Sequence, residues 1–279
     1  MYAETNPGFY DLCINAGNNE LQNLDKCKEI LVNQFGFGTV AININIDESI
    51  LGTDKRKKKK GNESESLSIV PEPIDVETLK VKFNGKLKIL SRITFACSDP
   101  GKTHIIAHCA TLKKYNLYAF APKTQNALQF ACSQLNTDLI TLRPSLTTLK
   151  LNKKLYDQAI ERGIHFEIQY SDILNSEWRK LAIHYSHLFH TYGKSRNVIL
   201  SSGANDVHMI RNPYDLINLS LILGLNELKA KSCILHQCRI LVLKAERRRC
   251  GKAVFVVEAE EETVESDEND SGLVKRIKL

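Results

Sequence analysis

Apolar segments rich in β-branched residues alternate with amphipathic stretches along most of the chain. Most of these segments are continuous apolar runs bounded by polar turns, which is the pattern of strands covered on both faces. Between them lie stretches such as Asn152 to Arg162, in which Leu155, Ala159 and Ile160 form an apolar stripe opposite charged residues. The expected strands are Phe9 to Ile14, Thr39 to Ile46, Leu87 to Phe95, Asn116 to Ala121, Asp138 to Leu142, Ile164 to Tyr170 and Asn197 to Ser201.

The alternation of strand and helix predicts an α/β fold with a parallel sheet, either doubly wound or closed into a TIM-like barrel. A βα barrel typically takes about 250 residues, and the chain has 279. No linker interrupts the apolar pattern before about Lys244, which favours a single barrel of about seven strands over residues 1–249. Two further helices, Tyr214 to Leu225 and about Glu227 to Arg248, should close its last wall.

Two segments lack the apolar content of a packed core. The long gap from Asp47 to about Asp75 (residues 47–75) contains a lysine run, a polar tract and two prolines, and it predicts a mobile, disordered insertion. Residues 250–279 predict a disordered tail, in which the acidic stretch Glu258 to Asp270 precedes a basic end. Both segments should lie outside the barrel.

The net charge of +6 is unevenly distributed, because Lys and Arg cluster in short runs. Such clusters serve nuclear import or phosphate binding, so the balance favours a nucleic acid as partner. The eight cysteines form no CxxC pair, and neither a signal peptide nor a membrane-spanning apolar stretch is evident, so we expect reduced thiols in the cytosol or nucleus and no membrane partner. The predicted nuclear-localisation residues are Lys55, Arg56, Lys57, Lys58, Lys59, Lys60, Lys275, Arg276 and Lys278.

The segment Ala96 to Thr103 satisfies a permissive phosphate-loop pattern between a predicted strand and a predicted helix. Its Pro100 has no N–H to offer a phosphate, and its single glycine permits little close approach. An N-cap at Ser98 or Asp99, with Pro100 in the first helical turn, explains the same residues. A P-loop nucleotide-binding protein remains an alternative.

The histidines do not form a convincing metal site. His184, His187 and His190 recur every three residues, so helical drift would splay them. His104 and His108 lack an acidic neighbour and a third ligand. No Ser-His-Asp set or nucleophile elbow can be assembled. We therefore expect no metal, no cofactor and no catalytic residue.

Several stretches match one family in order and spacing. They are Phe9 to Ile14, Leu90 to Phe95, Leu117 to Thr124, Gly163 to Ile168, Ser201 to Ala204 and Arg211 to Leu216. Over about Phe9 to Arg249 the chain resembles the barrel-shaped protein subunit shared by eukaryotic and archaeal ribonuclease P and, in eukaryotes, by ribonuclease MRP.

The resemblance implies a distorted barrel similar to the polymerase-and-histidinol-phosphatase (PHP) barrels, which hold catalytic metals with an H-x-H pair at the end of the first strand. Here that place is Asp11-Leu12-Cys13-Ile14-Asn15. Because the pair is missing, the resemblance implies a non-catalytic protein without the metal site, and cleavage is performed by the RNA subunit.

The resemblance also implies what the protein supports. It implies a role in tRNA 5′-leader removal by ribonuclease P and in pre-ribosomal RNA processing by ribonuclease MRP, in the nucleus and nucleolus. The implied partners are the ribonuclease P and MRP RNAs, pre-tRNA indirectly, and a small ferredoxin-like protein subunit. A metal-dependent phosphoesterase of the PHP barrel type and a protein scaffold without RNA contact remain alternatives.

Functional groups of a βα barrel gather at the carboxyl ends of its strands. Guanidinium groups there could bind phosphate bidentately or stack on unpaired bases. Replacing Arg92 or Arg211 with alanine should weaken RNA assembly and leave the melting temperature unchanged. The predicted RNA-binding residues are Arg92, Lys123, Arg143, Ser201 and Ser202 at strand ends, Arg196 and Arg211 in the loops flanking the last strand, and Arg179 and Lys180 on the helix after the sixth strand.

Overall fold

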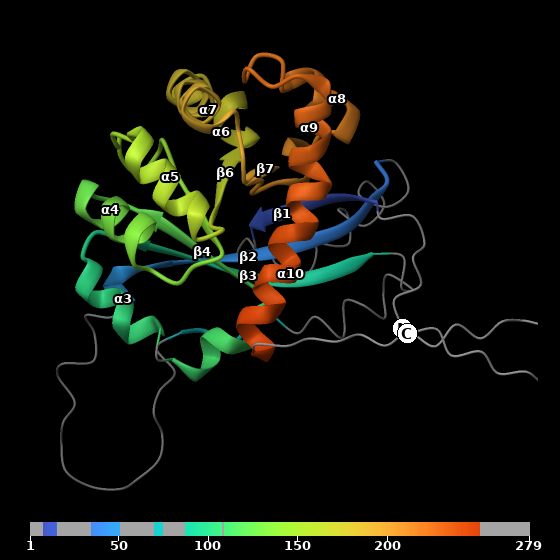
Figure 1. The fold of residues 1–279 in the computed structure, drawn as a ribbon. Coiled ribbons are helices and arrows are strands. Elements are labelled where there is room, and N and C mark those ends of the chain that lie inside the picture. Colours follow the sequence, from blue (N-terminus) through green and yellow to red (C-terminus); the bar gives the residue numbers. More distant parts are fainter. Residues whose placement is uncertain (1–7, 16–34, 51–69, 75–86, 108, 252–279) are drawn as a thin grey trace, which may run out of the picture.

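The computed structural model describes residues 8–15, 35–50, 70–74, 87–107 and 109–251 (Figure 1). The predicted nuclear-localisation residues, 55–60 and 275–278, lie outside the described residues, as does the predicted tail beyond Gly251. Within the described ranges, none of the helices has the length and hydrophobicity that a bilayer-crossing segment requires.

One sheet of seven parallel strands follows the order of the sequence. Its two edges meet, because the Asn15 N–H donates to the Ala204 carbonyl at 2.9 Å and the Gly203 N–H donates to the Cys13 carbonyl at 2.8 Å. The predicted distorted TIM-like barrel is therefore confirmed. The strands are β1 (Phe9–Asn15), β2 (Phe37–Asp47), β3 (Lys88–Cys97), β4 (Leu117–Pro122), β5 (Leu139–Thr141), β6 (His165–Gln169) and β7 (Val198–Ser201).

Most helices lie outside the barrel, and α10 lies across it (Figure 1). Side chains accept hydrogen bonds from the first turns of several of them, as with Thr124 before α4, Asn152 before α5 and Asn226 before α9. The α-helices are α3 (Pro100–Ala107), α4 (Gln125–Ser133), α5 (Lys153–Glu161), α6 (Tyr170–Leu174), α7 (Arg179–Gly193), α8 (Pro213–Leu219), α9 (Glu227–Ile234) and α10 (His236–Cys250), with short 3-10 turns η3 (Ala110–Lys114) and η4 (Val207–Met209).

The two helices predicted after the last strand are three in the structure. α8 ends at Leu219, and the chain turns back through Gly224, whose φ of +77° is a left-handed conformation that glycine adopts without strain. The long helix predicted from Glu227 to Arg248 divides at Leu235. A single straight helix could not pack against both cores, because α9 packs in the core between the sheet and its outer helices and α10 packs against the barrel interior.

The predicted insertion is shorter than expected at its C-terminal end. Val70 is fully buried in the core, and the Pro71 carbonyl accepts a hydrogen bond from the Tyr115 hydroxyl at 2.9 Å. Glu72 pairs with Lys114 at 2.8 Å. Residues 70–74 therefore belong to the packed fold, because a valine can be enclosed even inside a polar, proline-containing segment.

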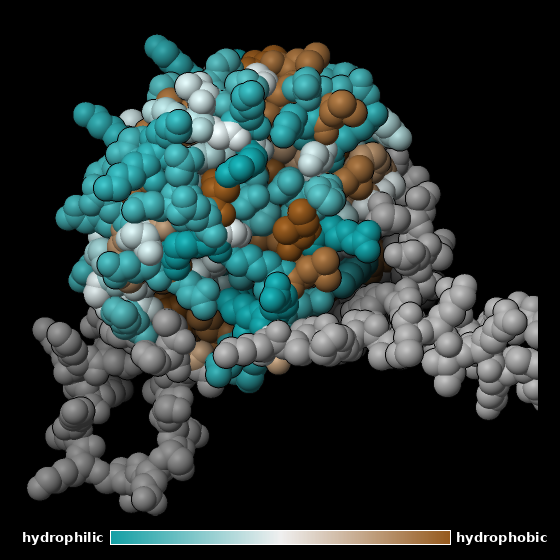
Figure 2. Space-filling view, viewed as in Figure 1, coloured by the Kyte–Doolittle hydropathy of each residue, from teal (hydrophilic) through white to brown (hydrophobic). Residues whose placement is uncertain are grey.

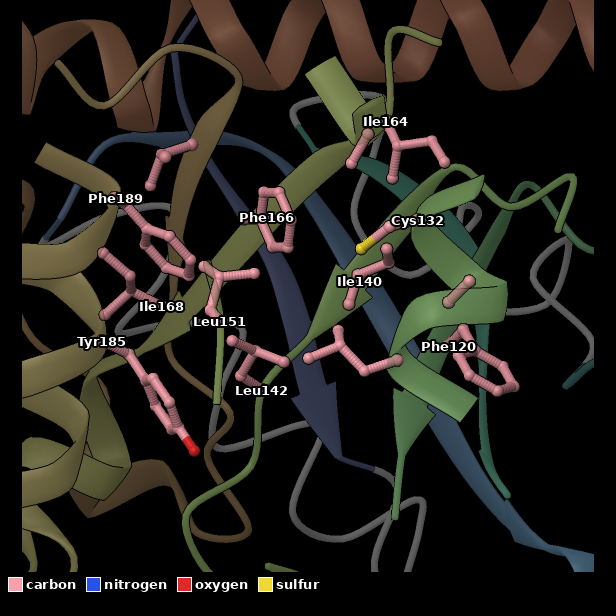
Figure 3. Close-up of a cluster of buried hydrophobic side chains, with 14 of the residues drawn as sticks. Phe120, Cys132, Ile140, Leu142, Leu151, Ile164, Phe166, Ile168, Tyr185 and Phe189 are labelled. Carbon is pink, nitrogen blue, oxygen red and sulfur yellow. The ribbon is translucent and has the colours of Figure 1, made fainter. Parts of the chain in front are cut away.

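Three apolar clusters pack the described part of the barrel, and the two larger ones lie on either side of the sheet. The first fills the space between the sheet and its outer helices, where Phe166 of β6 contacts Phe189 of α7 (Figure 3). Phe166 also stacks on Tyr156, with ring centroids 5.2 Å apart. The second fills the end of the interior where the strands begin, and Cys238, Leu241 and Ala245 of α10 close it. The barrel is thus a packed core rather than a pore.

Candidate functional site

Toward the carboxyl ends of the strands, the barrel interior becomes polar and is centred on Arg92. Its guanidinium is fully buried and forms a two-pronged ion pair with the Glu167 carboxylate of β6, with an Nη2–Oε2 distance of 2.7 Å. Nη1 also donates to the Leu12 carbonyl at 2.7 Å, and Nε donates to Thr94 Oγ1 at 3.3 Å. The rim position predicted for Arg92 is therefore wrong, because its side chain points inward from mid-strand.

The Glu167 carboxylate is surrounded by donors. Besides Arg92, it accepts hydrogen bonds from Thr141 Oγ1 at 2.6 Å, Ser201 Oγ at 2.7 Å and the Gln169 amide at 3.0 Å. Burial by itself raises the pKa of Glu167, but the charge and hydrogen bonds of Arg92 and the two hydroxyl donors lower it to about 2. The carboxylate therefore stays ionised and paired at neutral pH.

Ser202 lies where the two edges of the barrel meet. Its side chain is fully buried, and its Oγ donates to the Cys13 carbonyl at 2.7 Å. Its N–H donates to Asp11 Oδ1 at 3.0 Å, and burial raises the pKa of that carboxyl to about 6. Ser201 and Ser202 lie at the end of β7, as predicted, but both hydroxyls donate inside the barrel where its two edges meet.

A chain of side-chain amides leads from this interior to the mouth of the barrel. Thr94 Oγ1 donates to Asn43 Oδ1 at 2.6 Å, and Asn43 Nδ2 donates to Asn15 Oδ1 at 2.7 Å. Asn15 Nδ2 then donates to Asn205 Oδ1 at 2.8 Å at the surface. The network extends from the buried ion pair to solvent through neutral groups.

These donors do not fit a divalent metal ion. Cys13 lies within the segment Asp11 to Asn15, where the resemblance implies an H-x-H pair. Burial raises the pKa of the Cys13 thiol to about 12, so it is a neutral thiol at physiological pH. Arg92 already supplies a fixed positive charge to the interior. In the part of the chain that the structure describes, no three His, Cys, Asp or Glu side chains gather as metal ligands would.

The other cations predicted at the mouth are paired with acids. Lys123, after β4, pairs with Asp47 at the end of β2. Arg143 Nε lies 3.6 Å from Asp172 Oδ2, and 19% of the Arg143 side chain is exposed. These cations therefore have carboxylate partners with which an RNA phosphate would have to compete.

The remaining predicted cations are exposed but are not brought together. Arg179 and Lys180 begin α7, and Arg179 Nε donates to the Ile173 carbonyl at 2.8 Å. Arg211 follows β7, and its Nη1 donates to the His208 carbonyl at 2.8 Å. Arg196 precedes β7 and so lies at the opposite end of the barrel. The sequence therefore located four exposed cations but not a single convergent site.

The phosphate-like loop is occupied by the protein itself. Glu48 accepts hydrogen bonds from the Ser98 N–H at 3.1 Å and from the Ser98 hydroxyl, and it pairs with Lys102 at 3.4 Å. The hydrogen bond from the Ser98 hydroxyl is the main cause that lowers the pKa of Glu48 to about 2, so the side chain is an ionised carboxylate. This carboxylate lies where a nucleotide phosphate would have to bind. The P-loop alternative gains no support from the geometry.

The comparison with protein families gives the decisive observation. The model of the family described as RNase P subunit p30 matches residues 8–250, which is nearly all of the described chain. The chain belongs to this family. As a p30-type protein it is a subunit of ribonuclease P, as the resemblance in the sequence implied.

Individual relatives and structures agree with the p30 assignment. The chain is 29% identical to the mouse ribonuclease P protein subunit p30, over 97% of this chain and 98% of that protein. It is also 37% identical to the Arabidopsis thaliana protein GAMETOPHYTE DEFECTIVE 1, but that match spans 53% of this chain and only 26% of the plant protein. A chain of an archaeal ribonuclease P solved with mature tRNA shares the fold, with a TM-score of 0.61, 14% identity and coverage of 91% of this chain and 100% of that one.

The residue that sequence reasoning missed in this p30-type barrel is Glu167. It lies within an otherwise apolar strand, as Arg92 does in β3. A charge in a strand that is covered on both faces needs a buried partner, since an isolated ion is costly to bury. Two opposite charges in two such strands were therefore a signal that they pair with each other.

Proposed function

We propose that this chain is a non-catalytic protein component that supports removal of tRNA 5′ leaders by ribonuclease P and pre-ribosomal RNA processing by ribonuclease MRP. The family match over residues 8–250 carries the proposal. The barrel interior supports it, because the Arg92–Glu167 pair occupies the region where a hydrolase of this barrel type needs metal ligands. The chain would act in the nucleus and nucleolus, binding the ribonuclease P and MRP RNAs directly and pre-tRNA only indirectly.

Among the predicted cations, the exposed ones are the candidates for RNA contact. Arg179, Lys180, Arg196 and Arg211 are all exposed and have no carboxylate partner among the ion pairs found in the described residues. An exposed guanidinium can exchange water for phosphate at little cost, whereas Lys123 and Arg143 would first have to leave Asp47 and Asp172.

Purification of the full chain from nuclei, followed by sequencing of the bound RNA, tests the proposed function. Ribonuclease P RNA should be enriched together with pre-tRNA cleavage activity, and MRP RNA should be present as a second species. Hydrolysis of a phosphate ester by the isolated chain, lost on chelation, would instead favour a metal-dependent phosphoesterase. Recovery of protein partners without RNA would favour a pure scaffold.

The exposed apolar surface at the turn between α8 and α9 suggests where a protein subunit binds. Leu221, Ile222 and Leu228 have exposed fractions of 63%, 58% and 78%. Figure 2 shows apolar atoms gathered at the top of the molecule, over this turn. Large apolar side chains exposed together mark interaction sites more often than free surface. We propose that this surface receives the small ferredoxin-like subunit of the particle.

Replacement of Leu228 by aspartate should reduce co-purification of that subunit by at least about tenfold, because burying an unpaired carboxylate in an apolar interface costs several kcal/mol. Leu146→Asp is the matched control, since Leu146 is also exposed, at 43%, but lies outside this surface. Equal recovery of the subunit with Leu228→Asp and with the unmodified chain would show that it binds elsewhere.

A further inference from the structure

The C-terminal turn of α10 carries three consecutive arginines with different environments. Arg248 turns inward, and its guanidinium pairs with the buried Asp138 carboxylate at 2.9 Å. Arg249 Nε donates to the Lys113 carbonyl at 3.3 Å, and Arg247 is exposed. The buried ion pair therefore fixes the end of the helix to the barrel and leaves its neighbours at the surface.

Loops that precede the strands bring more cations to the same end of the barrel. Lys113 and Lys114 lie just before β4, beside the end of α10 (Figure 1). Lys244 of α10 donates to the Gly163 carbonyl at 2.8 Å and to the Arg162 carbonyl at 3.2 Å, just before β6. These hydrogen bonds join residues far apart in the sequence into one surface. We call it the α10 basic surface, and it comprises Lys88, Lys113, Lys114, Arg162, Lys244, Arg247, Arg248 and Arg249.

The α10 basic surface has an excess of positive charge. Among the described residues, the acids at this end are Asp138, which is buried under Arg248; Glu246, 3.7 Å from Lys88; Glu72, which pairs with Lys114; and the exposed Glu161. They are half as many as the cations. At the barrel mouth, Lys102, Lys123 and Arg143 each face one carboxylate, whereas Arg211, after β7, has none among the ion pairs of the described residues.

The lowered pKa of Lys244 reflects its burial and the positive charges around it. Burial is the main cause that lowers its pKa, and the neighbouring Arg162 and Arg248 lower it further, against an opposing effect of Asp138. A bound anion would relieve this repulsion. Figure 2 shows hydrophilic atoms around the lower end of α10, so the charged groups lie at the surface.

We propose that the α10 basic surface, at the end of the barrel where the strands begin, binds the phosphate backbone of the ribonuclease P RNA. This inference rests on the proposed function and adds an RNA-contact surface to the exposed candidates Arg179, Lys180, Arg196 and Arg211. Lys and Arg side chains that neutralise phosphates release counterions, which favours binding without base-specific contacts. The acidic stretch Glu258 to Asp270, which follows α10 in the sequence, is the competing occupant.

The double variant Arg247→Ala/Lys113→Ala tests this inference, because both side chains are exposed. The matched control is Lys153→Ala/Lys154→Ala, which removes the same charge from exposed residues at the start of α5. With full-length protein and ribonuclease P RNA, the first variant should bind about tenfold or more weakly near physiological salt. It should also lower the slope of log K against log salt by about two, and the control should change neither.

Three outcomes separate the possible explanations. If the unmodified chain neither binds nor co-purifies with ribonuclease P RNA, the proposed function fails. If it binds and the Arg247→Ala/Lys113→Ala variant, melting normally, binds equally well, only the present inference is overturned. The weaker RNA binding of Arg247→Ala/Lys113→Ala could also depend on the acidic stretch. If it disappears when Glu260, Glu261 and Glu262 are replaced by glutamine, the surface binds the chain's own acidic stretch. That result also overturns the inference.

Discussion

Replacement of Arg92 by methionine should destabilise the fold strongly. Methionine keeps the length of the side chain but removes the guanidinium, and it leaves the Glu167 carboxylate fully buried with only hydroxyl and amide donors. Removing one partner of a buried ion pair costs about 3–5 kcal/mol, because the other charge is left uncompensated. The Leu12 carbonyl also loses its 2.7 Å hydrogen bond from Nη1.

For a domain of this size, each kcal/mol lowers the melting temperature by about 2–4 °C, so the variant should melt about 6–20 °C below the unmodified protein. Calorimetry and urea unfolding measure this difference. The deficit should be largest near neutral pH and shrink as the pH falls. Without Arg92, burial raises the folded-state pKa of Glu167 above its unfolded value, and such a group becomes destabilising as the pH rises through the unfolded pKa.

The double variant Arg92→Met/Glu167→Met should recover much of the loss, because it removes both charges together. RNA affinity measured below the melting transition should stay close to normal for Arg92→Met. A variant that melts at the normal temperature but binds ribonuclease P RNA less tightly would refute the reasoning. That result would restore Arg92 to the RNA contact expected from the sequence.

Two further predictions concern pH and backbone geometry. His165 is 1% exposed, and burial together with the charge of Lys244 lowers its pKa from 6.5 to about 4. The stability that the neutral imidazole contributes is therefore present above pH 6.5 and is lost as the pH falls toward 4. Unfolding free energies of the unmodified protein and of His165→Gln should therefore shift relative to each other by about 2–3 kcal/mol between pH 7.5 and 4.5, and a constant difference would contradict this assignment. Gly203→Ala should cost more than about 1 kcal/mol, because φ is +60° and a Cβ would lie 2.5 Å from Gln169 Oε1. Gly36→Ala, at a similar φ of +71° with open space around it, separates backbone strain from this clash, and equal losses in urea unfolding would show that the clash is unimportant.

The barrel could be predicted from the sequence because its strands are continuous apolar runs, and the structure confirms their positions and parallel pairing. The division of the last helix at Leu235 could not, because the apolar spacing of Ile234, Cys238 and Leu241 fits one helix equally well. What divides it is tertiary packing, since Ile234 lies in the outer core while Cys238 and Leu241 close the barrel interior. Local periodicity contains no information on which core a helix will meet.

The candidate site was less predictable, because the face of a strand on which a residue lies depends on register. Arg92 and Ser201 lie in strands expected to end near the rim, but both side chains point inward to the same carboxylate. A register shift of one residue would have turned these side chains to the outer face of the sheet. The exposed Arg211 and Arg179 were easier to place, because loops and the first turns of outer helices lie at the surface.

The rule that functional groups gather at the carboxyl ends of barrel strands comes from enzymes, in which several strand ends must converge on one reacting atom. Phosphate binding needs no such convergence, because it depends on net positive potential over an extended surface. In this chain the mouth cations Lys102, Lys123 and Arg143 face carboxylates, whereas at the opposite end the main buried carboxylate, Asp138, binds Arg248 and leaves Arg247 exposed. If the α10 basic surface binds RNA, as we propose, the RNA surface of this barrel lies at the end that an enzyme of the same fold uses only for stability.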